Sequence, residues 1–331
     1  MIRMTRASIA LSALLWLVVG SVSAAERSAQ EWLDYMARAM RETSYTGTFV
    51  YRYGDQLETM AIVHRADGDG ERERLVTLNG KRREIIRDDT EVTCIFPDHD
   101  SVVVDRRQVR NPLNDLVPSE RADLGQSYEL AMRGEGRVAD REVVRIGIRP
   151  TDGYRYGYEL AIDRDTGLLL ASDLLAEDGD RVVEQIMFTS IELPSRIPDA
   201  ALEQTIDGED FTWHRRQREA DQNRPLKNDS GWDIDPAPEG FDVAMRERHT
   251  LPGRDVMVEH WLYTDGLATV SVYIERTKAD DGAFHGRSQM GAINVFGRMI
   301  GPYQIVVVGE VPAVTVESIG RSIKRRDGET P

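Results

Sequence analysis

The histidines and the single cysteine are the side chains best suited to metal binding or nucleophilic catalysis, and their spacing supports neither. The six histidines form no HExxH pattern and no short pairs with cysteine, which are the spacings that zinc sites use. Cys94 lies in the apolar run 92–96, where a buried small side chain is the simpler interpretation. No GxSxG or SxxK motif occurs. We therefore expect no catalytic residue, no metal and no cofactor.

Two short segments resemble ligand-binding loops but have the wrong surroundings. Residues 134–139 match the pattern GxGxxA, yet residues 143–148 alternate as a strand where a dinucleotide site needs a helix. Residues 163–167 begin like a calcium loop but lack its third acidic position and its distal glutamate. We interpret both segments as hairpin turns.

The first 25 residues predict a signal peptide. Arg3 and Arg6 precede a short apolar run over residues 9–19, and the small residues 22–25 permit cleavage. With no cysteine at that position to carry a lipid, we expect a diffusible periplasmic protein. The net charge of −15 argues against a nucleic-acid partner.

The elements that would position any site follow from periodicity. A capping box at Ser28 and Glu31 opens a helical pattern whose apolar positions are Trp32, Tyr35, Met36, Ala39 and Met40. Residues 45–53 then alternate with period two, as a strand does. Turn signals recur at residues 67–70, 79–80, 152–153 and 178–180. We predict the α+β class, with a curved antiparallel sheet laid over the helix.

The composition divides the remaining chain into two domains. The first spans residues 26–200, and a linker rich in proline and basic residues spans 201–231. The second domain spans residues 232–326, with strands at 256–263, 267–275 and 304–308 and a helix from about 314 to 324. Because the linker carries little apolar material, we expect the two domains to move relative to each other.

Several motifs in both domains resemble those of the periplasmic sigma-E regulators of the RseB/MucB family. In the first domain these are residues 45–51, 78–80, 83–87, 154–158 and 162–168. In the second domain they are residues 240–241, 263–268, 270–273 and 307–312. The resemblance covers nearly all of the chain beyond the signal peptide.

The resemblance implies a fold and a partner. The first domain would be a half-open barrel like that of the lipoprotein carrier LolA, and the second a smaller mixed α/β domain. The partner would be the periplasmic segment of an inner-membrane anti-sigma factor of the RseA/MucA type. The protein would shield that segment from site-1 proteolysis until lipid or lipopolysaccharide releases it, which makes it a negative regulator of the envelope-stress response.

Candidate binding residues follow from these expectations. For a lipid groove they are Trp32, Tyr35, Met36, Phe49 and Tyr51. For partner binding they are Tyr263, Thr264, Asp265, Gly266 and Leu267, in a second domain expected to be the main docking surface. The alternative is a lipid or lipoprotein carrier of the LolA type, but such carriers have one domain, so the second domain favours regulation. The sequence leaves open whether the protein forms a homo-oligomer.

Overall fold

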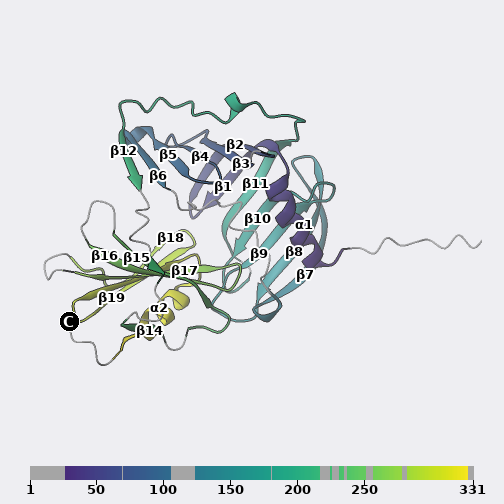
Figure 1. Cartoon of the computed structure of the whole chain (residues 1–331). Helices are drawn as coiled ribbons and strands as arrows, with labels where there is room; N and C mark the ends of the chain where they lie inside the picture. Colours follow the sequence, from purple (N-terminus) through teal and green to yellow (C-terminus); the bar gives the residue numbers. More distant parts are fainter. Residues whose placement is uncertain are drawn as a thin grey trace, which may run out of the picture.

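The structure, a computed structural model, is built around two β-sheets with one α-helix against each (Figure 1). It describes residues 27–68, 70–105, 124–179, 181–216, 224–225, 231–234, 237–250, 256–277 and 282–326. The predicted signal peptide lies outside these ranges. Within them the chain is mostly β, with two α-helices. The predicted helix packed against a large, mainly antiparallel sheet is confirmed, but the described residues are mostly β rather than an even mixture of helix and strand. The curvature of the sheet into a half-barrel stays a prediction.

Helix α1 (Ala29–Glu42) begins at the predicted capping box. The backbone N–H of Ser28 donates to the Glu31 carboxylate at 2.7 Å, and the Ser28 hydroxyl accepts from the backbone N–H of Glu31 at 3.3 Å. The apolar face of the helix buries Trp32, Leu33 and Met36 against the first sheet. The helix stays in place because this face joins the sheet's own core.

The first sheet has twelve strands in the order β12-β6-β5-β4-β3-β2-β1-β11-β10-β9-β8-β7. All pairs are antiparallel except β12 with β6, which is parallel. The strands are β1 (Tyr45–Tyr53), β2 (Gln56–Asp67), β3 (Gly70–Thr77), β4 (Glu84–Arg87), β5 (Val92–Phe96), β6 (Ser101–Asp105), β7 (Tyr128–Val138), β8 (Arg141–Pro150), β9 (Gly157–Asp163), β10 (Leu169–Leu175), β11 (Val182–Glu192) and β12 (Thr212–Arg216). Three 3-10 turns, Pro97–His99, Leu124–Gln126 and Asp199–Ala201, connect them.

The second sheet has seven antiparallel strands in the order β13-β15-β16-β17-β20-β19-β18. They are β13 (Arg224–Pro225), β15 (Asp242–Thr250), β16 (Met257–Thr264), β17 (Thr269–Arg276), β18 (Gly286–Met290), β19 (Ile293–Ile300) and β20 (Tyr303–Gly309). Helix α2 (Ala313–Ser322) packs Val316 and Ile319 into the core of this sheet. Strand β21 (Ile323–Arg325), which directly follows α2, pairs with β14 (Trp232–Ile234) in a two-stranded ribbon.

The structure tests the predictions for Cys94 and for the two segments that resemble ligand-binding loops. Cys94 lies buried in β5, as expected. Residues 163–167 form the predicted turn, in which the N–H of Gly167 donates to the carbonyl of Asp163 at 2.9 Å. The prediction of a turn at residues 134–139 is wrong, because β7 runs through Gly134 with a register shift and the chain reverses at Ala139 and Asp140. Those two residues adopt φ values of 48° and 61°, which the tight reversal requires.

The segment predicted as a linker takes part in both sheets. Its residues 212–216 form β12 at the edge of the first sheet, and residues 224–225 form β13 at the edge of the second. Composition missed this pairing because backbone hydrogen bonds to an edge strand need no apolar side chains. The domain bounds at 200 and 232 stay a prediction.

Candidate functional site between the two sheets

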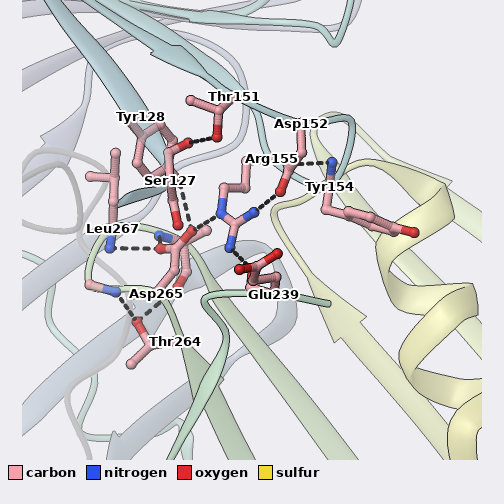
Figure 2. A network of polar contacts seen from close by, with 12 residues as sticks. Ser127, Tyr128, Thr151, Asp152, Tyr154, Arg155, Glu239, Thr264, Asp265 and Leu267 are labelled. Atoms are coloured by element: carbon pink, nitrogen blue, oxygen red, sulfur yellow. Dashed lines mark hydrogen bonds and ion pairs between the residues drawn. The ribbon is translucent and has the colours of Figure 1, made fainter. Parts of the chain in front are cut away.

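A buried arginine lies where the two sheets meet. Arg155, in the turn between β8 and β9, has no exposed side-chain surface. Its guanidinium donates to Asp152 in the same turn and, at 2.5 Å from Nε, to Asp265 in the turn between β16 and β17. It also donates to the carbonyl of Glu239 (Figure 2). The guanidinium lies 4.6 Å from the ring centre of Phe241. One side chain of the first domain thus holds three segments together.

Asp265 is equally buried and is fully hydrogen-bonded. Its Oδ1 accepts the backbone N–H groups of Leu267 and Ala268 at 3.0 and 2.7 Å, which shapes its own turn. Its Oδ2 accepts from Arg155 and, at 2.8 Å, from the hydroxyl of Tyr128 on β7 (Figure 2). Every lone pair of the carboxylate therefore faces a donor, as a buried charge requires.

The shifts in pKa keep the Arg155 guanidinium charged and the Tyr128 hydroxyl protonated, so that both can donate to Asp265. Burial acts to lower the pKa of Arg155, but its hydrogen bonds to Asp265 and Asp152 outweigh burial and raise it. Burial, with the charge of Asp265, raises the pKa of Tyr128 well above its ordinary value, so that hydroxyl keeps its proton and donates. We name Arg155, Asp265 and Tyr128 the interface latch.

Further contacts join the sheets beside the latch. The Glu184 carboxylate on β11 accepts the hydroxyl of Tyr51 at 2.7 Å and the backbone N–H of Ala292 at 2.9 Å. The amide of Asn294 on β19 donates to the hydroxyl of Tyr156 at 3.1 Å. Burial raises the pKa of Tyr156 to about 12. The Glu184–Ala292 and Asn294–Tyr156 bonds link the two parts, whereas the Tyr51–Glu184 bond joins β1 and β11 within the first sheet.

A cleft of about 750 Å³ opens between the sheets. Strands β9, β10 and β11 and the side chain of Tyr51 line one side, and β16, β17, β19 and β20 line the other. Its apolar members are Tyr51, Tyr158, Leu174, Ile186, Leu262, Leu267, Ala268, Tyr273, Ile293 and Val308. Glu184 and Glu310 add carboxylates. A cleft of this size and mixed lining suits a peptide or an amphiphile.

Metal chemistry and membrane spanning find no support among the described residues. No group of three or more histidine, cysteine, aspartate or glutamate side chains within those ranges could hold a metal ion. No helix in the same ranges is long and apolar enough to cross a membrane. The cleft and the latch therefore carry the functional interpretation.

Known protein domains match both halves of the chain. The MucB/RseB N-terminal domain matches residues 28–206, and the MucB/RseB C-terminal domain matches residues 226–324. The chain belongs to the MucB/RseB family. This membership confirms the resemblance seen in the motifs and the prediction of a regulatory, non-enzymatic protein.

Relatives in this family align along their whole length. The sigma factor AlgU regulatory protein MucB of Pseudomonas aeruginosa is 34% identical over 321 residues, which cover 94% of this chain and 96% of that protein. The sigma-E factor regulatory protein RseB of Haemophilus influenzae is 26% identical over 313 residues, with the same coverage. A crystal structure of MucB in complex with MucA(peri) is 31% identical, covers 91% of this chain and 100% of that one, and superposes with a TM-score of 0.68.

The candidate lipid residues of this MucB/RseB chain lie mainly in a closed core. Trp32, Met36 and Phe49 are buried between α1 and the first sheet, and Tyr35 and Tyr51 pack against that core. Only Tyr51 of the five also lines the cleft. Their role in lipid binding stays a prediction.

The candidate partner-binding residues lie at the end of β16 and in the turn that follows it, which carries Asp265 of the latch. Asp265 is buried in the latch, the hydroxyl of Thr264 accepts the N–H of Gly266 at 3.0 Å, and Tyr263 lies in the core of the second sheet. Leu267 packs into the core of the first sheet and lines the cleft. The structure therefore brings one predicted lipid residue, Tyr51, and one predicted partner residue, Leu267, to the same cleft.

Sequence reasoning missed Arg155, Tyr128 and Glu184 as site residues. A signal for Arg155 was present, since it is the one charge within the tyrosine-rich motif 154–158. Its partner Asp265 belongs to the other domain's motif, and a single sequence carries no information that pairs the two. Glu184 stands in an ordinary alternating strand and gave no signal.

Proposed function

We propose that this protein is a periplasmic regulator of a sigma factor and binds the periplasmic segment of an anti-sigma factor. The observation that carries the proposal is the match of both domains, in order, to a family whose relatives are named sigma factor regulatory proteins. A relative that aligns with 91% of this chain was solved in complex with MucA(peri). The predicted signal peptide supports the periplasmic location.

We further propose that the segment lies in the cleft between the sheets, where it is shielded from site-1 proteolysis, and that lipid or lipopolysaccharide displaces it. Support comes from the apolar side chains in the lining of the cleft. It also comes from Tyr51, a predicted lipid-binding residue, and Leu267, a predicted partner-binding residue, which both line this cleft. A disordered segment that becomes ordered on binding loses conformational entropy, so it binds with lower affinity for its contact area and is released more easily. The half-open barrel of the LolA type fits the long first sheet with α1 against it.

The binding test uses the mature chain, residues 26–331, and the anti-sigma segment encoded beside it or most similar to MucA. Thr269 is exposed and lines the cleft, so Thr269→Arg places a bulky cation there without altering the core. We expect affinity measured by calorimetry to fall by about tenfold or more, since the long arginine side chain would occupy space in the cleft that the segment needs. The control Ser288→Arg changes an exposed residue of β18, outside the cleft.

Two outcomes would contradict the proposal. If the wild-type chain fails to bind the segment, regulation through this partner is wrong, and recovery of outer-membrane lipoproteins instead would favour a carrier. If Thr269→Arg binds as tightly as Ser288→Arg, the segment lies outside the cleft. Lipopolysaccharide added to the wild-type complex should release the segment and expose it to site-1 cleavage.

A further inference from the structure

Glu184 places a carboxylate in the wall of the cleft between the sheets, where it is half-buried on β11. Its Oε2 accepts the hydroxyl of Tyr51 at 2.7 Å, and its Oε1 accepts the backbone N–H of Ala292 at 2.9 Å. Both donors are neutral. Glu184 forms no ion pair within the part of the chain that the structure describes. The fold therefore holds this negative charge in position without balancing it.

Other buried carboxylates of this protein have a cation of their own. Each of four pairs with an arginine at between 2.5 and 3.4 Å, namely Glu73, Glu84, Asp163 and Glu259. Such pairing offsets the cost of removing a charge from water. No lysine, arginine or histidine is among the described residues that line the cleft. The second carboxylate there, Glu310, makes a further interaction, so the unbalanced charge is assigned to Glu184.

Apolar side chains lie beside Glu184 on the same wall of the cleft. Leu174 of β10 is its partner across the strands, and Ile186 follows two residues later on the same face of β11. The methylene stem of a lysine or arginine could contact these residues while its charged head reaches the carboxylate. Each carboxylate oxygen accepts one hydrogen bond from the protein and can accept another. The site therefore suits a cationic donor on an apolar stem.

We propose that Glu184 selects a basic residue in the polypeptide that occupies the cleft. The inference rests on the proposed function, in which that polypeptide is an anti-sigma segment, and it names the side chain by which the segment is recognised. In an extended segment, alternate residues face the same way, so apolar residues should stand two positions before and after the basic one. The charge of Glu184 attracts a lysine or arginine and repels an acidic residue, which discriminates against other segments.

The first test uses three blocked pentapeptides, Leu-Ser-X-Ser-Leu, in which X is lysine, norleucine or glutamate. Their binding to the mature chain is measured by NMR titration, with no anti-sigma segment present. We expect the wild type to bind the lysine peptide about tenfold more tightly than the norleucine peptide, the effect of one charged hydrogen bond, and the glutamate peptide more weakly still. Glu184→Gln should lose this preference. Glu192→Gln, which changes an exposed residue of β11 outside the cleft, should keep it.

The second test replaces each lysine and arginine of the anti-sigma segment singly with glutamine. One replacement should weaken binding to the wild type by about tenfold and leave binding to Glu184→Gln unchanged, because both changes remove the same ion pair. The proposal is overturned if the wild type shows no preference for the lysine peptide, if Glu184→Gln keeps that preference, or if no basic residue of the segment couples to Glu184.

The peptide series separates this inference from the proposed function. A lysine preference that depends on Glu184, in a protein that fails to bind the anti-sigma segment, would support the cation site while contradicting the anti-sigma partner. The wild-type series needs no variant, so it decides the matter even where Glu184→Gln does not fold.

Discussion

Asp163 shows how a single buried carboxylate can organise a turn. Its side chain is 1% exposed and accepts from Arg141 at 2.5 and 3.1 Å and from the backbone N–H and hydroxyl of Thr166 at 2.8 and 2.7 Å. Burial acts to raise its pKa, but the hydrogen bonds from Arg141 and Thr166 prevail and lower it. Asp163, which resembled a calcium ligand in the sequence, therefore binds Arg141 and the backbone of the turn that it begins.

The lowered pKa of Asp163 gives a prediction about acid stability. A carboxylate whose folded-state pKa lies below its unfolded value stabilises the fold above the unfolded value, about 3.9, and loses this contribution as the pH falls through the lower folded value. Asp163→Asn should lower the free energy of unfolding at pH 7 by about 2 kcal/mol. It should also flatten the decline of stability below about pH 4. Urea unfolding between neutral and acidic pH measures both effects.

The control for this prediction is Asp140→Asn. Asp140 is 84% exposed and pairs only at the surface with Arg137, an interaction that contributes little. An unchanged acid dependence in Asp163→Asn would contradict the assignment of Asp163 as a stabilising carboxylate.

At the level of elements, the sequence predicts what is decided within a few residues. The capping box of α1, the strand over residues 45–53 and the turn at 163–167 all depend on local side-chain chemistry, and all are confirmed. The parallel edge strand β12 was missed because pairing register is a long-range property. The same reason hid the candidate site, whose two halves come from different domains. The reversal at Ala139 and Asp140 is local, but the glycines at 134 and 136 shifted the predicted turn to the wrong residues.

Gly167 connects a local turn to the packing of α1. Its φ is +80°, and a Cβ at this position would lie 2.8 Å from the ring of Tyr35. Gly167→Ala should lower the free energy of unfolding by more than about 1 kcal/mol, because it combines backbone strain with a clash. Chemical denaturation followed by far-UV circular dichroism measures this. Gly153→Ala, where a Cβ meets nothing within 4 Å, is the control and should stay within about 0.5 kcal/mol of the wild type.

On the scale of the whole molecule, the two sheets are joined by side-chain contacts as well as by the connecting segment. Leu267 and Ala292, from the second part of the chain, belong to the core of the first sheet. Arg155 and Asp265 are both fully buried between the parts. The expectation of domain movement, which was drawn from the linker alone, now requires that these contacts separate. It stays a prediction.

This interface predicts that the two sheets unfold together. Trp32 reports on the first core and Trp261 on the second, so single-tryptophan variants should give coincident urea midpoints. Asp265→Ala removes one of the two carboxylates that pair with the buried Arg155 guanidinium and the acceptor of the Tyr128 hydroxyl, which should cost about 3 kcal/mol and separate the two transitions. Glu135→Gln, which breaks the exposed pair with Arg164, is the control. Separate midpoints in the wild type would show that the latch does not couple the sheets.

The pairing of β1 with β11 has a consequence for the order in which the chain acquires its structure. Thr46 pairs with Glu192, so the centre of the first sheet forms only after most of that domain is free to fold. The edge strand β12 follows later still, and the latch needs Asp265. Folds dominated by such distant pairings form in milliseconds to seconds rather than microseconds. During that interval β1 has an unpaired edge, which leaves the newly made chain open to aggregation and proteolysis until β11 has paired with it.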